Sequence, residues 1–525
     1  MTDPSAAHPE RTVELVVDGE PVSVVDRGGS LLAALRDQLG IRSVKDGCSP
    51  QGQCGCCTVL VDGAPRVSCV TPLRRVAGRS IATIDGLDDD VRSAWADALC
   101  ATGGSQCGFC TPGIVVRLAG LAAKDAQVEG HTPVERALQA HLCRCTGWQT
   151  IVEAWDLVAA GTPVDLGARD LDAASRRATI EGGAPQVVAP EVALGRGGFA
   201  DDTAPADALV AVRAADGSWA VGEGLEEARA AAGKVQGRRT TVDAAPPLAA
   251  PEGAWDATLR TSWVEPAYLE TDATWCAPGG QPASSLANGG AFGAKAADHL
   301  GTVARELADR HGRPVRVLWS REDVVRLGPK RPPLAGGARA DGTGRIVVAR
   351  TPGIAAAIAS VAPGLEVEEV DLVGPPTSAA VRAAGWAEAV VLLAGARGEV
   401  GRVVAPSGGW AEASVADGRI AVTVGAGDPL DEVVLRAYAI GAAHMAYGWI
   451  TGEAIAVDAD GEVLDLTVRS FGVPRAIDTP PIDVRIDPTP GPPVNGSDAA
   501  FAAVAAAVWR HLGCPESLPT GGSIP

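Results

Sequence analysis

The sequence has no apolar run approaching 18 residues, so no segment is expected to span a membrane. It also lacks an excess of positive charge, because 64 acidic side chains outnumber 45 basic ones and leave a net charge of −19. A nucleic-acid-binding protein needs a basic face, so that class is excluded. The N-terminal stretch MTDPSAAHPERT lacks the apolar centre of a secretory signal, and we therefore expect the chain to work in the reducing cytoplasm.

Cysteine is scarce in most of the chain, since ten of the twelve cysteines lie within the first 145 residues. A disulfide scaffold is typical of short secreted chains, whereas 525 residues are enough for about three or four domains. Hydrophobic residues make up 46% of the sequence, which is enough to bury substantial cores. Thiols crowded into one part of a cytoplasmic protein indicate metal binding.

A first thiol set follows a spacing close to that of plant-type ferredoxins, C-x4-C-x2-C…C. Its members are Cys48, Cys54, Cys57 and Cys69. The first gap is one residue longer than in the pattern, so we expect the loop to bulge at Ser49-Pro50. Gly47, Gly52 and Gly55 allow the backbone to turn N–H groups toward thiolate sulfur. Cys56 is interpreted as a spare thiol, because Cys54 and Cys57 keep the two-residue gap.

A second thiol set combines a C-x2-C pair with a C-x-C pair: Cys107, Cys110, Cys143 and Cys145. The first pair precedes a predicted helix, where the helix dipole favours a thiolate. The second pair follows a predicted helix and enters the turn Thr146-Gly147. Either set alone could be a structural zinc site, which also uses C-x2-C pairs. The two sets together, the first with ferredoxin-like spacing, favour iron–sulfur clusters.

The pattern of strands and helices predicts a multidomain α+β protein. Strands are expected at Thr12–Val17, Pro21–Val25, Thr58–Val61, Arg66–Val70 and Ile81–Ile84, and a helix after a Ser30 cap. Helical signals fill residues 90–160, and residues 163–200 are typical of a linker. Short strands and Ala-rich helices follow, including Ala297–His311 and Ala499–His511. We place the domain boundaries at 1–86, 87–162, 163–200 and 201–525.

Three stretches carry a family resemblance: QGQCGCCTVLVDG, GSQCGFCTPGIV and HLCRCTGWQTIVEAW. They resemble the iron–sulfur subunit of the molybdenum hydroxylases, the family of xanthine dehydrogenases and aldehyde oxidoreductases. The resemblance implies a β-grasp plant-type ferredoxin domain and a four-helix-bundle domain, each with one [2Fe–2S] cluster. It also implies that Gln106 hydrogen-bonds a pterin.

The region after residue 200 is similar to a shortened, degenerate molybdopterin subunit of the same family. GRGGFADD resembles the opening of that subunit, and EPAYLETDATWCAP one of its strands. GGAFGAK resembles a glycine-rich loop beside the metal, which implies Gly289, Gly290, Phe292 and Gly293 as cofactor-binding residues. Arg382 is interpreted either as a ligand of a pterin phosphate or as a salt-bridge partner.

The family's catalytic glutamate has no counterpart here. The matching region reads Pro493-Val494-Asn495-Gly496-Ser497-Asp498, and Asp498 is one methylene shorter than a glutamate. A general base must reach the reacting atoms, so Asp498 is a weak catalytic candidate and is more naturally a helix cap. No catalytic residue is therefore assigned, and a molybdopterin in this chain is doubtful.

The resemblance supports three alternative functions. The first is an electron-transfer component that works with a molybdopterin-binding large subunit and a FAD subunit, because no FAD-binding stretch lies in this chain. The second is a single-chain molybdenum hydroxylase that acts on an aldehyde or N-heterocycle. The third is a cluster-bearing structural or sensor protein without turnover. No nucleic acid or membrane is expected as a partner.

Overall fold

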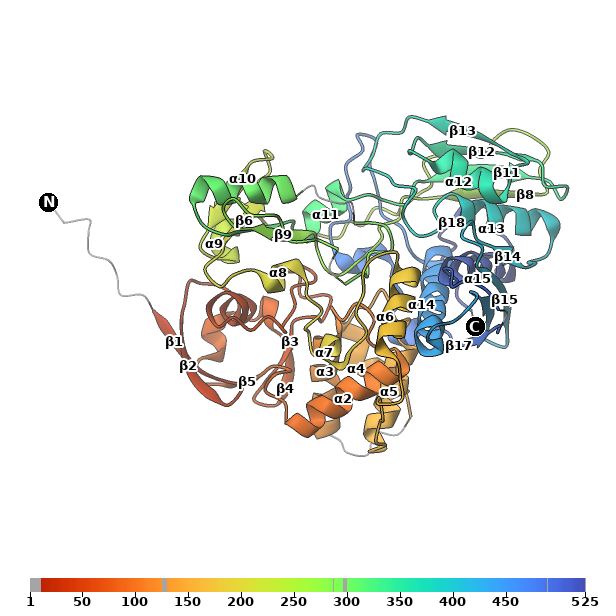
Figure 1. Ribbon diagram of the computed structural model, residues 1–525. Coiled ribbons are helices and arrows are strands. Elements are labelled where there is room, and N and C mark those ends of the chain that lie inside the picture. The colour runs from red at the N-terminus through yellow and green to blue at the C-terminus, as the bar shows by residue number, and fades with distance from the viewer. Residues whose placement is uncertain (1–10, 125–129, 287, 296–299, 489, 525) are drawn as a thin grey trace.

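The computed structural model describes residues 11–124, 130–286, 288–295, 300–488 and 490–524. The chain is a multidomain mixture of helices and strands built around four separate sheets. The N-terminal sheet, the helices beside it and two C-terminal lobes are distinct in Figure 1. No helix in the described residues is both long enough and apolar enough to cross a membrane.

The first sheet has the order β2-β1-β5-β3-β4. Its strands are β1 (Thr12–Val17), β2 (Glu20–Val25), β3 (Thr58–Val61), β4 (Ala64–Val67) and β5 (Ser80–Ala82). Strand β1 pairs parallel to β5 and antiparallel to β2, so the sheet is mixed. The predicted strands Thr12–Val17, Pro21–Val25 and Thr58–Val61 are confirmed. The predictions Arg66–Val70 and Ile81–Ile84 each share only two residues with β4 and β5, and Ser68–Val70 form a 3₁₀ turn. Ser30 caps α1 (Leu31–Ala33), with its Oγ accepting from the Ala33 N–H, and a π-helical turn follows (Ala34–Gln38).

The predicted helical region contains four helices, which lie beside the first sheet (Figure 1). They are α2 (Asp89–Thr102), α3 (Thr111–Lys124), α4 (Thr132–Ala137) and α5 (Gln149–Ala159). Helices α2 and α5 pack together through Trp95 and Trp155, whose ring centroids are 6.1 Å apart.

The stretch expected to be a linker contains helices. Helix α6 (Leu171–Gly182) packs against α14 (Glu432–Thr451), and the two run side by side in Figure 1. The short helices α7 (Pro190–Ala193) and α8 (Ala200–Thr203) follow. The apolar face of α6, including Ala174 and Ala178, is buried, and this packing is not visible in the local composition.

Three further sheets and their helices form the rest of the chain. The second sheet, β7-β6-β10-β9, comprises β6 (Leu209–Arg213), β7 (Trp219–Gly222), β9 (Ala273–Cys276) and β10 (Val315–Leu318). The third, β13-β12-β11-β8-β18, comprises β8 (Ala257–Thr261), β11 (Leu334–Ala338), β12 (Gly344–Ala349), β13 (Leu365–Val370) and β18 (Ser517–Leu518). The fourth, β14-β15-β16-β17, comprises β14 (Val403–Val404), β15 (Trp410–Ala416), β16 (Arg419–Gly425) and β17 (Ile482–Ile486).

The helices of this region are α9 (Leu225–Ala231), α10 (Gly301–His311), α11 (Arg321–Leu327), α12 (Ile354–Val361), α13 (Trp386–Arg397), α14 and α15 (Ser497–His511). Helices α10 and α15 confirm the two Ala-rich helices predicted, except that residues 297–299 lie outside the described residues. Helix α15 packs on α14 and α13. One continuous apolar core joins the N-terminal sheet and helices to the C-terminal lobes, so the two parts of the chain fold against each other.

Candidate metal centres

The first thiol set is buried, with the four side chains at most 4% exposed. Cys48 lies within hydrogen-bonding reach of both Cys54 and Cys69, and Cys69 also of Cys57. Hydrogen bonds from Cys54 and Cys69 lower the pKa of Cys48 well below its usual value. The same contact with Cys48 raises the pKa of Cys69. Thiols packed this closely cannot all ionise unless a cation replaces their protons, and metal binding releases those protons.

The loop between Cys48 and Cys54 turns sharply at the extra residue. Ser49 has φ +45°, and its N–H is held by Asp46 Oδ1 over 3.0 Å. Two residues later the Gln51 N–H donates to Cys48 Sγ over 3.1 Å. Gly52 has φ +71°, a conformation that favours glycine. The loop therefore aims a backbone dipole at sulfur, which offsets thiolate charge.

The second thiol set is also buried, and Cys107 is the most exposed of the eight cysteines at 8%. Cys107 Sγ lies 3.6 Å from Cys145 Sγ. Cys110 is within hydrogen-bonding reach of Cys143, a contact that lowers the pKa of Cys143 to about 6. The Thr146 hydroxyl lies 3.1 Å from Cys143 Sγ. The turn before α3, which carries Cys107 and Cys110, therefore meets the segment after Ala140, which carries Cys143 and Cys145. The two cysteine pairs come together as the sequence predicted.

In the second set the thiols come together in pairs, Cys107 with Cys145 and Cys110 with Cys143. In the first set Cys48 contacts Cys54 and Cys69, and Cys69 also contacts Cys57. In the described part of the chain, no group of three or more His, Cys, Asp or Glu side chains surrounds one point as ligands of a single ion. A four-cysteine zinc site needs such a group, whereas a [2Fe–2S] cluster takes two protein thiolates on each iron. The donor set therefore fits [2Fe–2S] clusters better than zinc.

The two thiol sets meet at Gly47. A Cβ atom on Gly47 would lie 3.0 Å from Cys56 Sγ, 3.1 Å from Cys54 Sγ and 3.3 Å from the ring of Phe109. Phe109 belongs to the Cys107–Cys110 turn, so it brings the second set against the first. The Leu142 N–H, next to Cys143, also donates to the carbonyl of Cys54 over 3.0 Å. A hydrogen bond and direct packing contacts therefore connect the two sets, and Cys56 lies at their junction.

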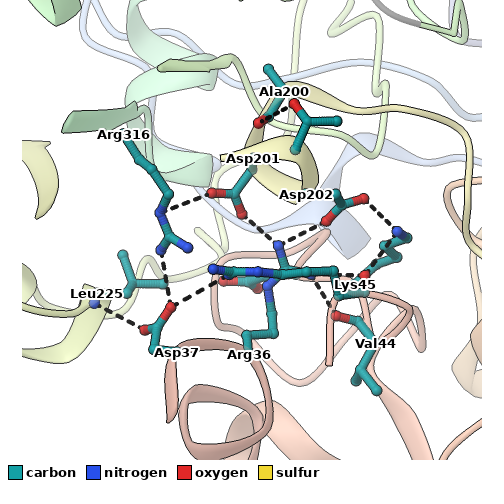
Figure 2. Close-up of polar contacts among 12 residues, drawn as sticks. Arg36, Asp37, Val44, Lys45, Ala200, Asp201, Asp202, Leu225 and Arg316 are labelled. Carbon is teal, nitrogen blue, oxygen red and sulfur yellow. Dashed lines mark hydrogen bonds and ion pairs between the residues drawn. The ribbon is translucent and has the colours of Figure 1, made fainter. Parts of the chain in front are cut away.

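A buried ion network joins the first-set loop to the C-terminal region. Figure 2 shows Arg36 bound to Asp201 (2.6 Å) and Asp202 (2.9 Å), with Lys45 on the far side of Asp202. Arg316 of β10 extends the network by binding Asp37 (3.0 Å) and Asp201.

The charges in this network depend on one another. Burial opposes ionisation of Asp201, but Arg316 and Arg36 hold its pKa well below the usual range. Burial lowers the pKa of Lys45, and Asp202 counteracts that effect. Asp201 and Asp202 belong to the stretch GRGGFADD, for which the sequence showed only a family resemblance. No sequence pattern indicated that Asp202 would bind Arg36 and Lys45, which lie more than 150 positions earlier.

The residues that the resemblance assigns to a pterin are occupied by contacts within the chain. Gln106 is buried, and its Nε2 donates to the Ala437 carbonyl of α14 over 3.2 Å. The same helix lies on the second thiol set, because a Cβ on Gly441 would be 1.9 Å from the Cys145 carbonyl oxygen. Helix α14 therefore covers the face of the second set from which Gln106 would contact a cofactor.

The glycine-rich loop also packs against protein. A Cβ on Gly290 would lie 3.0 Å from Cys107 Sγ, and one on Gly293 would lie 1.7 Å from the Ala380 carbonyl oxygen. Gly289 packs against Gln186 in the same way. Phe292 lies under the Arg382 guanidinium, with 4.2 Å between the guanidinium carbon and the ring centroid.

Asp498 lies in the first turn of α15. There it forms a 3.0 Å ion pair with Arg382, whose Nη2 also donates to Ser497 Oγ over 2.8 Å. The cavity beside Phe292 and Arg382 is about 30 Å³, comparable to the space of one or two waters. The contacts of Gln106 and of the glycine-rich loop leave little room for a molybdopterin, and the ion pair with Arg382 occupies the carboxylate of Asp498.

Known proteins that resemble this chain are consistent with iron–sulfur binding. A family model described as a [2Fe–2S] binding domain matches residues 83–156. The xanthine dehydrogenase iron-sulfur-binding subunit of Escherichia coli O157:H7 is 38% identical over 143 residues, which are 27% of this chain and 89% of that protein. The nicotine 6-hydroxylase small subunit of Paenarthrobacter nicotinovorans is 38% identical over 155 residues, 29% of this chain and 92% of that protein.

A longer relative matches over the same share of the chain. The aldehyde oxidoreductase of Megalodesulfovibrio gigas is 41% identical over 138 residues, and the match spans 25% of this chain but only 15% of that protein. The solved structure of an aldehyde oxidoreductase from Desulfovibrio gigas aligns with 97% of this chain and 99% of that chain at a TM-score of 0.70. Its 14% sequence identity shows a shared fold alone.

The matching [2Fe–2S] binding-domain model covers residues 83–156, which hold the second thiol set, and an iron-sulfur-binding subunit is among the relatives, so the chain carries [2Fe–2S] clusters. The chain belongs to the molybdenum hydroxylases, the oxidoreductase family of xanthine dehydrogenases and aldehyde oxidoreductases.

Proposed function

We propose that this chain is the electron-transfer component of a molybdenum hydroxylase, receiving electrons from a molybdopterin site on a larger partner chain and passing them to a flavin or other acceptor. Any FAD would be bound by a further chain. In this proposal residues 1–86 are a β-grasp, plant-type ferredoxin-like domain and residues 87–162 a four-helix-bundle cluster domain. Residues 163–200 connect them to a truncated relative of the molybdopterin subunit, residues 201–525. The small-subunit relatives support the presence of a large partner.

The contact between the two thiol sets carries this proposal. The bound clusters supply one-electron chemistry. The chain's own residues hold the two sites against each other through Phe109 at Gly47 and through the Leu142–Cys54 hydrogen bond. They also keep water away, because all eight thiols are buried. A continuous protein contact of this kind is what a two-site electron relay requires.

The filled pterin position argues against the single-chain alternative. A hydroxylase needs a metal site with room for substrate and a general base within reach of the reacting atoms. Here α14 covers Gln106, and the ion pair with Arg382 occupies the carboxylate of Asp498. These contacts support a chain that contributes to hydroxylation only by moving electrons.

Metal analysis of the chain purified anaerobically with its partners tests the proposal. We expect about four iron atoms and no molybdenum in this chain, with molybdenum in a larger copurifying chain. Adding a hydroxylase substrate to the complex should bleach the visible iron–sulfur absorption of this chain. One molybdenum bound to the isolated chain would instead support the single-chain hydroxylase. A chain without partners that passes no electrons would support a structural or sensor role.

A further inference from the structure

The loop that carries Cys48 and Cys54 presents a regular series of carbonyl oxygens to the C-terminal region. The carbonyls of residues 47, 49, 51 and 53 each accept a hydrogen bond from a side chain at least 180 residues away. Three of the four donors are arginines: Arg321, Arg229 and Arg469. The fourth is the amide of Gln236.

The three arginines come from different elements. Arg321 of α11 donates to the Gly47 carbonyl over 2.6 Å and is fully buried. Arg229 of α9 donates to the Ser49 carbonyl over 3.0 Å. Arg469 of the 3₁₀ turn η5 (Val468–Phe471) donates to the carbonyl of residue 53 over 3.1 Å. We call Arg229, Arg321 and Arg469 the collar arginines.

The same loop turns an N–H toward sulfur, since Gln51 donates to Cys48 Sγ. The collar arginines act on the first thiol set directly through their positive charge. Burial lowers the pKa of Arg469, while Cys54 and Cys48 act in the opposite sense, so its guanidinium lies within electrostatic range of these thiols. It stays protonated at any working pH.

Two carboxylates near the loop partly balance this charge. Glu322 accepts from the Gln51 side-chain amide over 3.0 Å. Asp46 accepts from the Ser49 N–H over 3.0 Å. The three guanidinium groups exceed the negative charge of these two carboxyl groups.

Among the residues that the structure describes, no comparable group of arginines donates to the loops of the second thiol set. Arg144, between Cys143 and Cys145, has its guanidinium in a bidentate ion pair with Glu453, at 2.6 and 2.7 Å. The Cys107 carbonyl accepts from the neutral amide of Asn288 over 2.8 Å. The electrostatic surroundings of the two sets are therefore unequal.

We propose that the collar arginines raise the reduction potential of the cluster held by Cys48, Cys54, Cys57 and Cys69, and so make it the preferred electron acceptor within the chain. This inference rests on the proposed electron-transfer function. Reduction adds one electron to a site that already holds four thiolates, so nearby cations stabilise the reduced state more than the oxidised one. The C-terminal region then has a role without binding a cofactor: it tunes the first cluster.

The test is an EPR-monitored redox titration of the full chain with Arg229→Gln, Arg469→Gln and the double variant. Both arginines are only partly buried, and glutamine keeps a hydrogen-bond donor while removing the charge. We expect each variant to weaken reduction of the first cluster relative to the second by about threefold. The double variant should weaken it by about tenfold, which equals 59 mV for a one-electron couple. Arg229→Lys and Arg469→Lys should restore most of the potential.

Arg345→Gln is the matched control, because Arg345 is an exposed, ion-paired arginine of β12. It should leave both potentials unchanged. The signal of the first cluster is identified by its loss in Cys57→Ser. If the double variant loses iron, the potentials of the two single variants show whether the collar arginines raise the potential of the first cluster.

An unchanged potential in clusters that are fully assembled would overturn the role of the collar arginines. Failure of the proposed electron-transfer function would give a different result. The potential of the first cluster would still shift in the arginine variants, but a reduced partner would not reduce the clusters of this chain.

Discussion

The side-chain amide of Gln106 donates a hydrogen bond to the carbonyl oxygen of Ala437, with 3.2 Å between Nε2 and the oxygen. The amide Oε1 of Gln106 is buried without a hydrogen-bond partner in the described structure. In a family in which this glutamine is expected to hold a pterin, it here joins the second-cluster region to helix α14. We propose that its role in this chain is structural.

Replacing Gln106 with leucine tests this conclusion. Because the amide gains one hydrogen bond and leaves one buried oxygen unpaired, we expect the free energy of unfolding to change by no more than about 1 kcal/mol. Iron content should stay at that of the parent, and molybdenum should be absent from both proteins. Denaturant unfolding and metal analysis measure these quantities. Molybdenum present in the parent and lost in Gln106→Leu would show that the glutamine binds the cofactor.

The junction of the two thiol sets separates the roles of Cys56 and Cys57. Cys57 lies within hydrogen-bonding reach of Cys69, whereas Cys56 faces Cys54 and the second set. We expect Cys56→Ser to keep both clusters, because serine fills the same space without removing an iron ligand. Cys57→Ser should lose the first cluster and about half of the iron. Iron analysis and visible circular dichroism measure the outcome, and the reverse result would exchange the two assignments.

The sequence predicted the elements whose signals are local. The strands of the first sheet, the cap at Ser30 and the helix that begins at Thr111 depend on residues close in the chain, and the structure has them all. The short spacings C-x2-C and C-x-C are also local signals, although the contact between Cys107 and Cys145 joins residues 38 positions apart. Residues 163–200 read as a linker because alanine and charged residues dominate, although the buried face of α6 is visible only once α14 lies against it.

The long-range side-chain contacts of the C-terminal region could not be predicted from the sequence. No local pattern singles out Arg321, and its contact with the Gly47 carbonyl joins it to a residue 274 positions earlier. The side chain of Asp498 was interpreted as a helix cap or a base, and it forms an ion pair with Arg382. Contacts between residues so far apart depend on how the lobes pack, which no local pattern of a single sequence encodes.

Acid should weaken the fold through His141. Its Nε2 lies 3.2 Å from the Thr58 hydroxyl and 3.3 Å from the Gly113 carbonyl. Burial, aided by the nearby Arg117, lowers the pKa of His141 to about 3. The unfolded chain binds a proton below about pH 6.5 and the native chain does not, so stability falls as the pH falls from 6.5 toward 3. One such histidine costs about 2 kcal/mol at pH 5.

The variant His141→Gln should remove that part of the pH dependence. Denaturant unfolding at pH 7 and pH 5 should show a smaller loss of stability for the variant than for the parent. His444→Gln should act in the same direction, since burial lowers the pKa of His444 to about 4. An equal loss of stability in parent and variant would mean that His141 is protonated in the folded protein.

The contact between Gly290 and Cys107 gives the sharpest test of how the C-terminal region closes over the second cluster. Gly290 has φ +86°, and a Cβ there would lie 3.0 Å from Cys107 Sγ and 3.1 Å from Cys107 Cβ. Gly290→Ala must therefore push the loop away from the second thiol set. Gly279→Ala is the matched control, because Gly279 has φ +66° but nothing lies within 4 Å of its added Cβ.

Both glycine variants should lose about 1 kcal/mol of unfolding free energy, because alanine disfavours a positive φ. Only Gly290→Ala should in addition change the EPR signal of the second cluster or lower its iron occupancy, while the first cluster keeps its signal. If the two variants behave alike, the loop at Gly290 does not press on Cys107, and α14 alone covers that cluster. If Gly290→Ala disturbs the first cluster instead, the two sets are coupled through the loop itself rather than through Phe109 and Gly47.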